Sequence, residues 1–221
     1  MASDHNDSQF VHVPSLDPPV RGYLHVPESA STDGLVLTHG AGANCQSALL
    51  VGLASALYNA NVTVLRCDLS FRQERPHGPP NRSAERDQQG LKRAVEWIRE
   101  RVSGRVFLGG HSYGGRQASM LAASEPSLVE GLLLLSYPLH PPKRPDQLRT
   151  AHFPDLRTPA LFVSGTRDGF GTVEELMSAI SLIPARTRLF TVEGVGHELL
   201  RKRGGEDLLH DIAKSFAAMY K

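Results

Sequence analysis

Short apolar runs recur along the chain at intervals that predict a parallel β-sheet. Each run is rich in Leu, Val or Phe, and Gly, Asp or Ser residues close it. Strands that are apolar on both faces are typical of a parallel sheet covered by helices on each side. The runs occupy residues 35–37, 62–65, 106–108, 132–135, 160–163 and 189–192.

Segments with the period of an α-helix lie between these runs. Their apolar side chains recur three or four residues apart, which places them on one helix face. We interpret these stripes as the core-facing sides of helices that cover the sheet. The stripes are Leu49, Leu50, Leu53 and Leu57; Leu91, Val95, Ile98 and Val102; Val173, Leu176, Met177 and Ile180; and Leu208, Ile212, Phe216 and Tyr220.

Strands and helices that alternate over the whole chain predict a doubly wound α/β fold with helices on both faces of the sheet. Residues 10–14 and 22–26 add an antiparallel hairpin at the start, with Asp17-Pro18-Pro19 as its turn. The length of 221 residues fits one domain over residues 1–221. Ligands of such folds bind beyond the carboxyl ends of the strands, so we expect the functional site on the loops that follow the runs.

Two long proline-rich stretches, residues 71–83 and 137–158, show little helical period. The second is the place where many folds of this type insert a helical cap. It is too short and too irregular for a full cap, so we expect an open site or one covered only by a loop.

Composition narrows the function classes. The 24 Lys and Arg residues against 23 Asp and Glu residues give a net charge of +1, which offers no basic excess for nucleic acid. No apolar stretch approaches the roughly 18 residues of a membrane span. Cys45 and Cys67 form neither a C-x-x-C pair nor part of a metal constellation, so we expect free thiols, no metal and no cofactor. Together with the polar residues 1–7, this predicts a cytoplasmic protein.

The pattern Gly110-His111-Ser112-Tyr113-Gly114 is the main functional signal. It follows the apolar run 106–108 and precedes the small-residue stretch 115–123, so it stands between a strand and a helix. In that setting G-x-S-x-G is a nucleophile elbow, a sharp turn that exposes the serine hydroxyl above the sheet. The alternative is an ordinary glycine-rich turn.

Serine needs a base and a third group that orients the base before it becomes a nucleophile. Asp168 follows the run 160–163, and His197 follows the last run, in the chain order Ser, Asp, His that this elbow uses. We therefore predict a catalytic triad of Ser112, Asp168 and His197. The alternatives are a turn or helix-cap role for Asp168 and a structural loop role for His197.

A tetrahedral intermediate also needs two backbone N–H donors for its oxyanion. Tyr113, directly after the nucleophile, is expected to supply one. Ala41, in His39-Gly40-Ala41-Gly42-Ala43 after the first parallel run, is expected to supply the other. A phosphate-binding loop is the competing interpretation, but G-x-G-x-x-G and G-K-[ST] patterns are absent.

Several charged side chains near these loops are candidates for substrate contact. We single out Arg72, Arg116 and His140, because a guanidinium that faced the pocket would favour a carboxylate or phosphate on the substrate. The alternative is a solvated charge run, with Arg116 paired to an acid such as Asp68. For His39 and His111 a structural role is favoured. The other arginines around the loop after run 62–65 are Arg66, Arg75 and Arg82.

These motifs together resemble the α/β-hydrolase superfamily over residues 20–221. The more specific similarity is to its small cap-less branch related to dienelactone hydrolases, which includes an α/β-hydrolase-like domain of a chromatin-complex subunit and of a testis-expressed protein. The resemblance implies a mostly parallel sheet of eight strands, or nearly so, without a full cap domain. It also implies the triad roles of Ser112, Asp168 and His197. The motifs that carry the narrower similarity are His39-Gly40-Ala41-Gly42, residues 109–116, Tyr137-Pro138-Leu139-His140-Pro141-Pro142 and Gly165-Thr166-Arg167-Asp168.

The expected function is hydrolysis of a small ester or thioester through an acyl-enzyme, with a small-molecule acyl substrate as the partner. Dienelactone is not expected as substrate, because dienelactone hydrolases proper carry cysteine where this chain has Ser112. Peptidase, acyltransferase and perhydrolase chemistry use the same groups. Members of the branch often lack an assigned activity, so the alternative is a non-catalytic interaction module with residues 137–158 as its contact surface.

Overall fold

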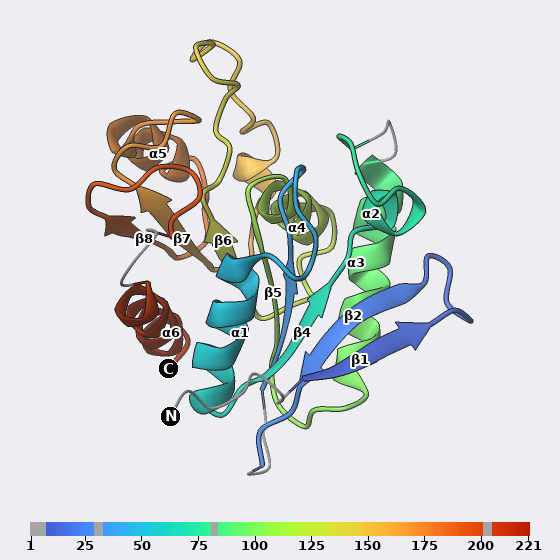
Figure 1. Ribbon diagram of the computed structural model, residues 1–221. Helices are drawn as coiled ribbons and strands as arrows, with labels where there is room; N and C mark the ends of the chain where they lie inside the picture. The colour runs from blue at the N-terminus through green and yellow to red at the C-terminus, as the bar shows by residue number, and fades with distance from the viewer. Residues whose placement is uncertain (1–7, 29–32, 81–83, 201–204) are drawn as a thin grey trace.

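One mixed sheet forms the centre of the protein (Figure 1). The structure is a computed structural model, and it describes residues 8–28, 33–80, 84–200 and 205–221. The eight strands are β1 (Ser8–Val13), β2 (Val20–His25), β3 (Gly34–Thr38), β4 (Thr63–Cys67), β5 (Val106–His111), β6 (Gly131–Leu135), β7 (Ala160–Gly165) and β8 (Thr187–Val192). Their spatial order is β1-β2-β4-β3-β5-β6-β7-β8. The expected fold class, a doubly wound and mostly parallel eight-stranded sheet, is confirmed.

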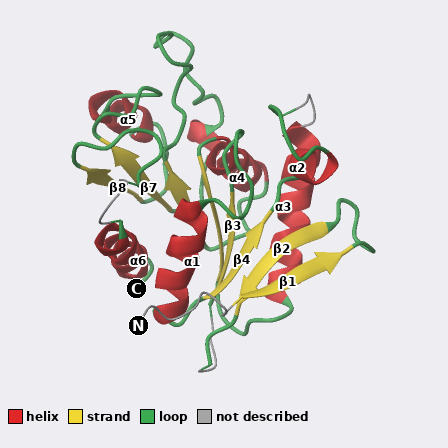
Figure 2. Cartoon of the chain, in the orientation of Figure 1, coloured by secondary structure: helices red, strands yellow, loops and turns green. Residues whose placement is uncertain are grey.

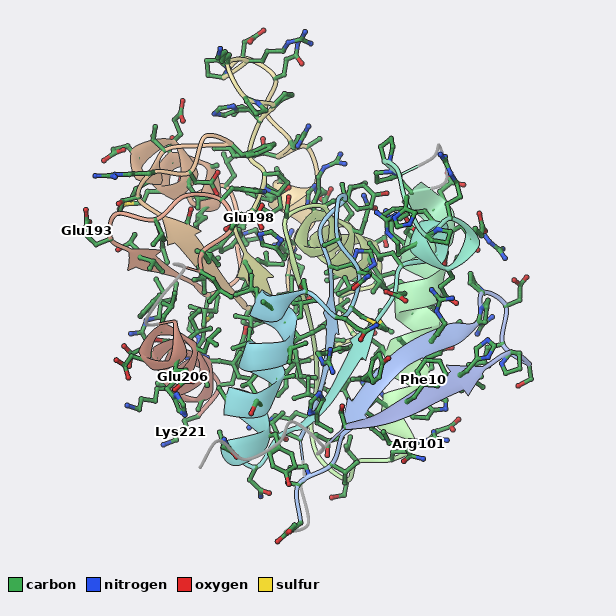
Figure 3. All side chains as sticks on the ribbon, in the orientation of Figure 1. Phe10, Arg101, Glu193, Glu198, Glu206 and Lys221 are labelled. Carbon is green, nitrogen blue, oxygen red and sulfur yellow. The ribbon has the colours of Figure 1, made fainter. Side chains whose placement is uncertain are left out.

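Strand direction separates the hairpin from the rest of the sheet. β1 pairs with β2, and β2 with β4, in antiparallel register, whereas every pair from β4 to β8 is parallel. Phe10 lies on the outer strand of the hairpin, 55% exposed, and packs edge-on against Tyr23 (Figure 3). The predicted opening hairpin is therefore present at one edge of the sheet.

Helices cover both faces, as Figure 2 shows. They are α1 (Ala48–Asn59), α2 (Ser70–Glu74), α3 (Ala84–Arg99), α4 (Tyr113–Ser124), α5 (Val173–Ile180) and α6 (Glu206–Met219). α1 and α6 lie together on one face, and α3 and α4 lie on the other (Figure 1).

The two faces have separate cores, because alternate residues of each strand point to opposite sides. Val36 of β3 is in register with Leu65 of β4 and Leu108 of β5, and all three belong to the core under α3 and α4. Leu35 and Leu37, one position away on the same strand, belong to the core under α1 and α6. Burial of each such side chain contributes roughly 1.5–3 kcal/mol to stability.

Three expectations need correction. β8 has no fully buried residue, because it is the edge strand and helices cover it incompletely. Met177 of the third stripe is 60% exposed on the outer side of α5. The proline-rich stretch 71–83, expected to be irregular, begins inside the short helix α2.

The stretch 137–158 has no full cap. Its only described helical segment is the single 3₁₀ turn Phe153–Asp155. Its tip extends away from the sheet with side chains spread into solvent (Figure 3). The site at the carboxyl ends of β5, β7 and β8 is thus bordered by loops.

Candidate active site

Ser112 occupies a sharp turn between β5 and α4. Its φ of 51° and ψ of −117° are a conformation that residues other than glycine rarely adopt, at a cost of roughly 1–3 kcal/mol. Two backbone hydrogen bonds hold the turn: Ser112 N–H donates to the Leu135 carbonyl at 2.8 Å, and the Ser112 carbonyl accepts from Arg116 N–H at 3.0 Å. The strand-to-helix elbow expected from the motif is present.

Gly114 lets the elbow approach the loop after β3. A Cβ atom at this position would lie 2.5 Å from the His39 carbonyl oxygen and 2.6 Å from Thr38 Cγ2. Any larger residue would push the two loops apart. The glycine two residues after the serine is therefore a steric requirement of the site.

The structure brings Ser112, His197 and Asp168 together, although they lie far apart along the chain. His197 Nε2 is 2.8 Å from Ser112 Oγ, and His197 Nδ1 is 2.9 Å from Asp168 Oδ2 and 3.0 Å from Oδ1. The Asp168 side chain is buried at 2% exposure, whereas the His197 side chain is 16% exposed. The three side chains thus lie within hydrogen-bonding distance in the order Ser, His, Asp, and their catalytic roles stay a prediction.

Neighbouring groups fix the orientation of His197. The Phe170 ring stacks on its imidazole at a centroid distance of 4.1 Å, and Phe170 N–H donates to Asp168 Oδ1 at 2.9 Å. His111 Nε2 lies 2.9 Å from the His197 carbonyl oxygen and donates to it. Burial lowers the pKa of His111, so this imidazole is neutral and its role is to hold the loop. The sequence motifs did not single out Phe170.

The approach of the His197 loop depends on Gly165 at the end of β7. A Cβ atom there would lie 2.3 Å from the Val195 carbonyl oxygen and 2.8 Å from that of Gly196. The absent side chain lets the loop after β8 cross over the end of β7 and reach the serine.

Tyr113 and Ala41, the expected oxyanion donors, border the same cavity of about 530 Å³ as Ser112. Tyr113 is the first residue of α4, where backbone N–H groups lack partners within the helix. Its hydroxyl donates to Asp87 Oδ2 at 2.9 Å on α3, which leaves the backbone amide as the group available to a ligand. Asp87 also accepts from Phe71 N–H at 2.9 Å and so joins α3 to α2.

The expectation that Arg72 contacts substrate is corrected by its hydrogen bonds. Its side chain is buried, and the guanidinium donates to the carbonyl oxygens of Ala41 at 2.7 Å and Ala43 at 2.8 Å. Two further bonds reach the carbonyls of Arg75 and Gly78. Arg72 therefore braces the loop that carries Ala41 and does not border the Ser112 cavity.

His140 is also corrected. It is 6% exposed, and its Nδ1 lies 2.8 Å from the Pro141 carbonyl oxygen. Its Nε2 lies 3.3 Å from Glu175 Oε2, and its backbone N–H donates to the Phe170 carbonyl. These contacts tie the loop after β6 to α5, and His140 is not among the residues that border the Ser112 cavity.

Arg116 does border the cavity, and its contact with substrate stays a prediction. The alternative pairing with Asp68 is wrong, because Asp68 instead accepts from Arg21 Nη2 at 2.9 Å and from Cys45 N–H at 2.9 Å. Arg149 borders the cavity as well. It was not singled out, because nothing in a proline-rich loop indicates which of its charges faces a site.

His39 has the structural role that was favoured for it. It is fully buried, its Nδ1 donates to the Gly40 carbonyl at 2.9 Å, and its Nε2 accepts from Leu69 N–H at 3.1 Å. Burial lowers its pKa to about 4, so the ring is neutral. Of the remaining candidates, Arg82 and residues 1–7 lie outside the described residues.

Among the residues that the structure describes, no cluster of His, Cys, Asp and Glu could hold a metal ion. Cys45 and Cys67 are buried free thiols, and burial raises the pKa of Cys67 to about 12. None of the helices in the described ranges is long and apolar enough to cross a membrane.

Comparison with known proteins gives a consistent family and fold. Residues 31–221 match the family model of the alpha/beta hydrolase domain. A dienelactone hydrolase from Anabaena variabilis superposes with a TM-score of 0.73 and 20% identity, covering 97% of this chain and 98% of that one. A lidless α/β serine hydrolase from Xanthomonas campestris superposes with a TM-score of 0.74 and 16% identity, covering 96% of this chain and 95% of that one. Est1E from Butyrivibrio proteoclasticus superposes with a TM-score of 0.74 and 16% identity, covering 96% of this chain and 98% of that one.

Proposed function

Since this chain belongs to the alpha/beta hydrolase family, we propose that it is a serine hydrolase that cleaves a small ester or thioester. The observation that carries the proposal is the continuous hydrogen-bond chain from Ser112 Oγ through both nitrogens of His197 to the buried carboxylate of Asp168. A hydroxyl, an imidazole and a carboxylate in this order are the groups that nucleophilic acyl transfer requires.

In the proposed reaction Ser112 Oγ attacks the substrate carbonyl carbon while His197 Nε2 takes the hydroxyl proton. Asp168 accepts the Nδ1–H bond, which fixes the tautomer and stabilises the imidazolium that forms. The N–H groups of Tyr113 and Ala41 receive the oxyanion of the tetrahedral intermediate.

Collapse of the intermediate breaks the bond to the leaving group, which takes the proton from His197 Nε2. A water molecule then gives a proton to His197 and attacks the acyl-enzyme. A second collapse returns that proton to Ser112 Oγ and releases the acid.

The loop-bordered cavity of about 530 Å³ supports small acyl substrates and a carboxylesterase or thioesterase of the EC 3.1 class. The similar solved structures include a dienelactone hydrolase and a serine hydrolase without a lid, and their names agree with this class. We also place the reaction in the cytoplasm, since two buried free thiols suit a reducing compartment.

The competing proposal is a non-catalytic interaction module. The direct test compares wild type, Ser112→Ala and the control Ser124→Ala, whose serine lies on α4 and donates to the Leu121 carbonyl of the same helix. We expect fluorophosphonate labelling of wild type and Ser124→Ala only. Turnover of p-nitrophenyl acetate should fall at least about 10³-fold in Ser112→Ala. Equal labelling and turnover in all three proteins would favour the interaction module.

A further inference from the structure

Two arginines border the cavity above Ser112, and neither is paired with a carboxylate of the described residues. Arg116 lies on α4 one turn after the serine, and Arg149 lies in the loop between β6 and β7. Within the described ranges, neither forms an ion pair with Asp or Glu, although other arginines of the chain do.

Arg116 has a side-chain N–H group without a hydrogen-bond acceptor among the described residues. Its Nε is buried and has no hydrogen-bond partner among the residues described. Its guanidinium lies near the Tyr137 hydroxyl, and burial raises the pKa of that phenol, so Tyr137 stays neutral and cannot compensate the charge. A buried donor without an acceptor costs roughly 1–3 kcal/mol, which an incoming acceptor would recover.

Arg149 is half-buried beside this group. Its Nη1 makes one long contact of 3.3 Å to the Pro138 carbonyl, and its backbone carbonyl accepts from the Tyr137 hydroxyl at 2.6 Å. Burial and the charge of Arg116 both lower the pKa of Arg149, so the two guanidinium groups are close enough to repel one another.

The surroundings supply further donors, and no Asp or Glu is among the described residues that border the cavity. Gln117 is fully buried, borders the cavity, and its Nε2 has no acceptor among the described residues. His152 Nε2 lies 2.8 Å from Ser119 Oγ, and burial together with Arg116 lowers its pKa to about 4, so the ring is neutral. This side of the cavity therefore carries two positive charges, and two nitrogen atoms, Arg116 Nε and Gln117 Nε2, have no acceptor among the described residues.

We propose that the substrate carries a carboxylate or another small anionic group, which Arg116 and Arg149 bind while the substrate carbonyl lies at Ser112. This inference rests on the hydrolase function proposed above. Arg116 N–H donates to the Ser112 carbonyl at 3.0 Å, so Arg116 lies one turn of backbone beyond the serine. The anionic group is therefore expected a few bonds from the carbonyl that is attacked. Planar guanidinium forks suit the two oxygens of a carboxylate.

The anionic group can belong to the acyl part or to the leaving group, and two substrate pairs distinguish these sources. The first pair is mono-p-nitrophenyl adipate and neutral p-nitrophenyl pentanoate. The second is acetoxybenzoate and its methyl ester. We expect wild type to prefer the anionic member of at least one pair by about tenfold or more in kcat/KM. Arg149→Gln and Arg116→Gln should each lower that preference about tenfold, because charge-assisted bonds to the anion are lost.

Arg144→Gln is the matched control. Arg144 lies in the same loop as Arg149, is exposed, and does not border the cavity. The same charge change there should leave the substrate preference unaltered. A similar loss of preference in all three variants would overturn the inference, because it would reveal a general field effect.

Calorimetric titration of adipate into Ser112→Ala, with and without Arg149→Gln, separates this inference from the hydrolase proposal. Adipate binding that depends on Arg149 supports the anion subsite even if every ester stays intact, in which case only the proposed hydrolase function fails. Turnover of neutral and anionic esters at equal rates in wild type would overturn the subsite and leave the hydrolase function standing. Absence of both turnover and adipate binding would overturn both.

Discussion

Two pairs of arginines differ in what occupies their N–H groups. Arg66 and Arg72 are 3% and 4% exposed, and both donate to backbone carbonyls of the loop after β3. Arg116 and Arg149 border the cavity above Ser112, and their guanidinium groups make few hydrogen bonds.

The difference teaches how a buried charge is used. The Arg72 guanidinium donates hydrogen bonds to four backbone carbonyls, including those of Ala41 and Ala43, and holds these two residues in place. The protein itself therefore satisfies the hydrogen-bonding groups of this charge. Arg116 and Arg149 are half-buried and form no ion pair within the described ranges, and Arg116 Nε has no hydrogen-bond partner there, so bonding capacity remains for a ligand. The first pair builds the site, and we assign the second pair to the substrate.

The largest expected loss of stability and activity follows substitution of Arg72, a member of the pair Arg66 and Arg72. Arg72→Met leaves four carbonyl groups without a donor, and the free energy of unfolding should fall by about 4 kcal/mol. The loop with Ala41 should also loosen, so kcat for p-nitrophenyl acetate should fall about 10²-fold. Urea unfolding and steady-state kinetics measure both.

Arg75→Met is the control for this prediction, since Arg75 is an exposed arginine three residues away. It should change stability by less than about 0.5 kcal/mol. Wild-type kcat in Arg72→Met would contradict the bracing role, and the two pairs of arginines would no longer differ as described.

Acid sensitivity comes next. Burial lowers the pKa of His39 from 6.5 to about 4, so the unfolded chain binds a proton between these values that the folded protein does not. Stability therefore falls as pH drops from 6.5 to 4, by up to about 3 kcal/mol from this residue. His39→Gln keeps one donor and one acceptor without the titration. Its unfolding free energy, measured from pH 7 to pH 4, should show a shallower slope than wild type.

His25 and His152 also have pKa values lowered to about 4, chiefly by burial, so part of the slope should remain in His39→Gln. An unchanged slope would mean that His39 does not contribute to acid sensitivity. That outcome would weaken the description of the loop after β3 as a buried, neutral scaffold.

The sheet could be predicted because burial on both faces leaves a direct mark on composition. Runs such as 132–135 correspond to a strand with every residue buried, and the stripe with Ile212 and Phe216 faces the core as expected. The strand at residues 189–192 is present as predicted, but it lies at the edge of the sheet and has no fully buried residue. The pattern missed α2, which is too short to show a period.

The candidate site divides in the same way. Ser112, Asp168 and His197 could be found because the chemistry requires these residue types in a known chain order. The partners of Arg72 could not be found, since Ala41 lies 31 residues away and accepts through its backbone, which carries no sequence signal. The same holds for Phe170, whose stacking on His197 depends on how two separate loops meet.

A smaller effect is expected at Asp68, which also holds the loop after β3. Its Oδ1 accepts from Cys45 N–H and its Oδ2 from Arg21, both at 2.9 Å. Asp68→Asn weakens these charge-assisted bonds and should lower the free energy of unfolding by about 1–2 kcal/mol. Asp17→Asn is the control, because the Asp17 side chain is 83% exposed and its ion pair with Arg86 should be worth less than about 1 kcal/mol. Equal losses in urea unfolding would show that burial of Asp68 adds nothing.

The smallest stability effect is expected at Arg149, and it is the sharpest test of the comparison. Arg149→Met removes one long hydrogen bond and the repulsion from Arg116. These changes oppose each other, so the free energy of unfolding should stay within about 0.5 kcal/mol of wild type. Urea unfolding beside Arg72→Met measures the contrast directly. A loss above about 1.5 kcal/mol would mean that the protein itself satisfies Arg149 as it does Arg72, because only a side chain with structural partners costs that much to remove.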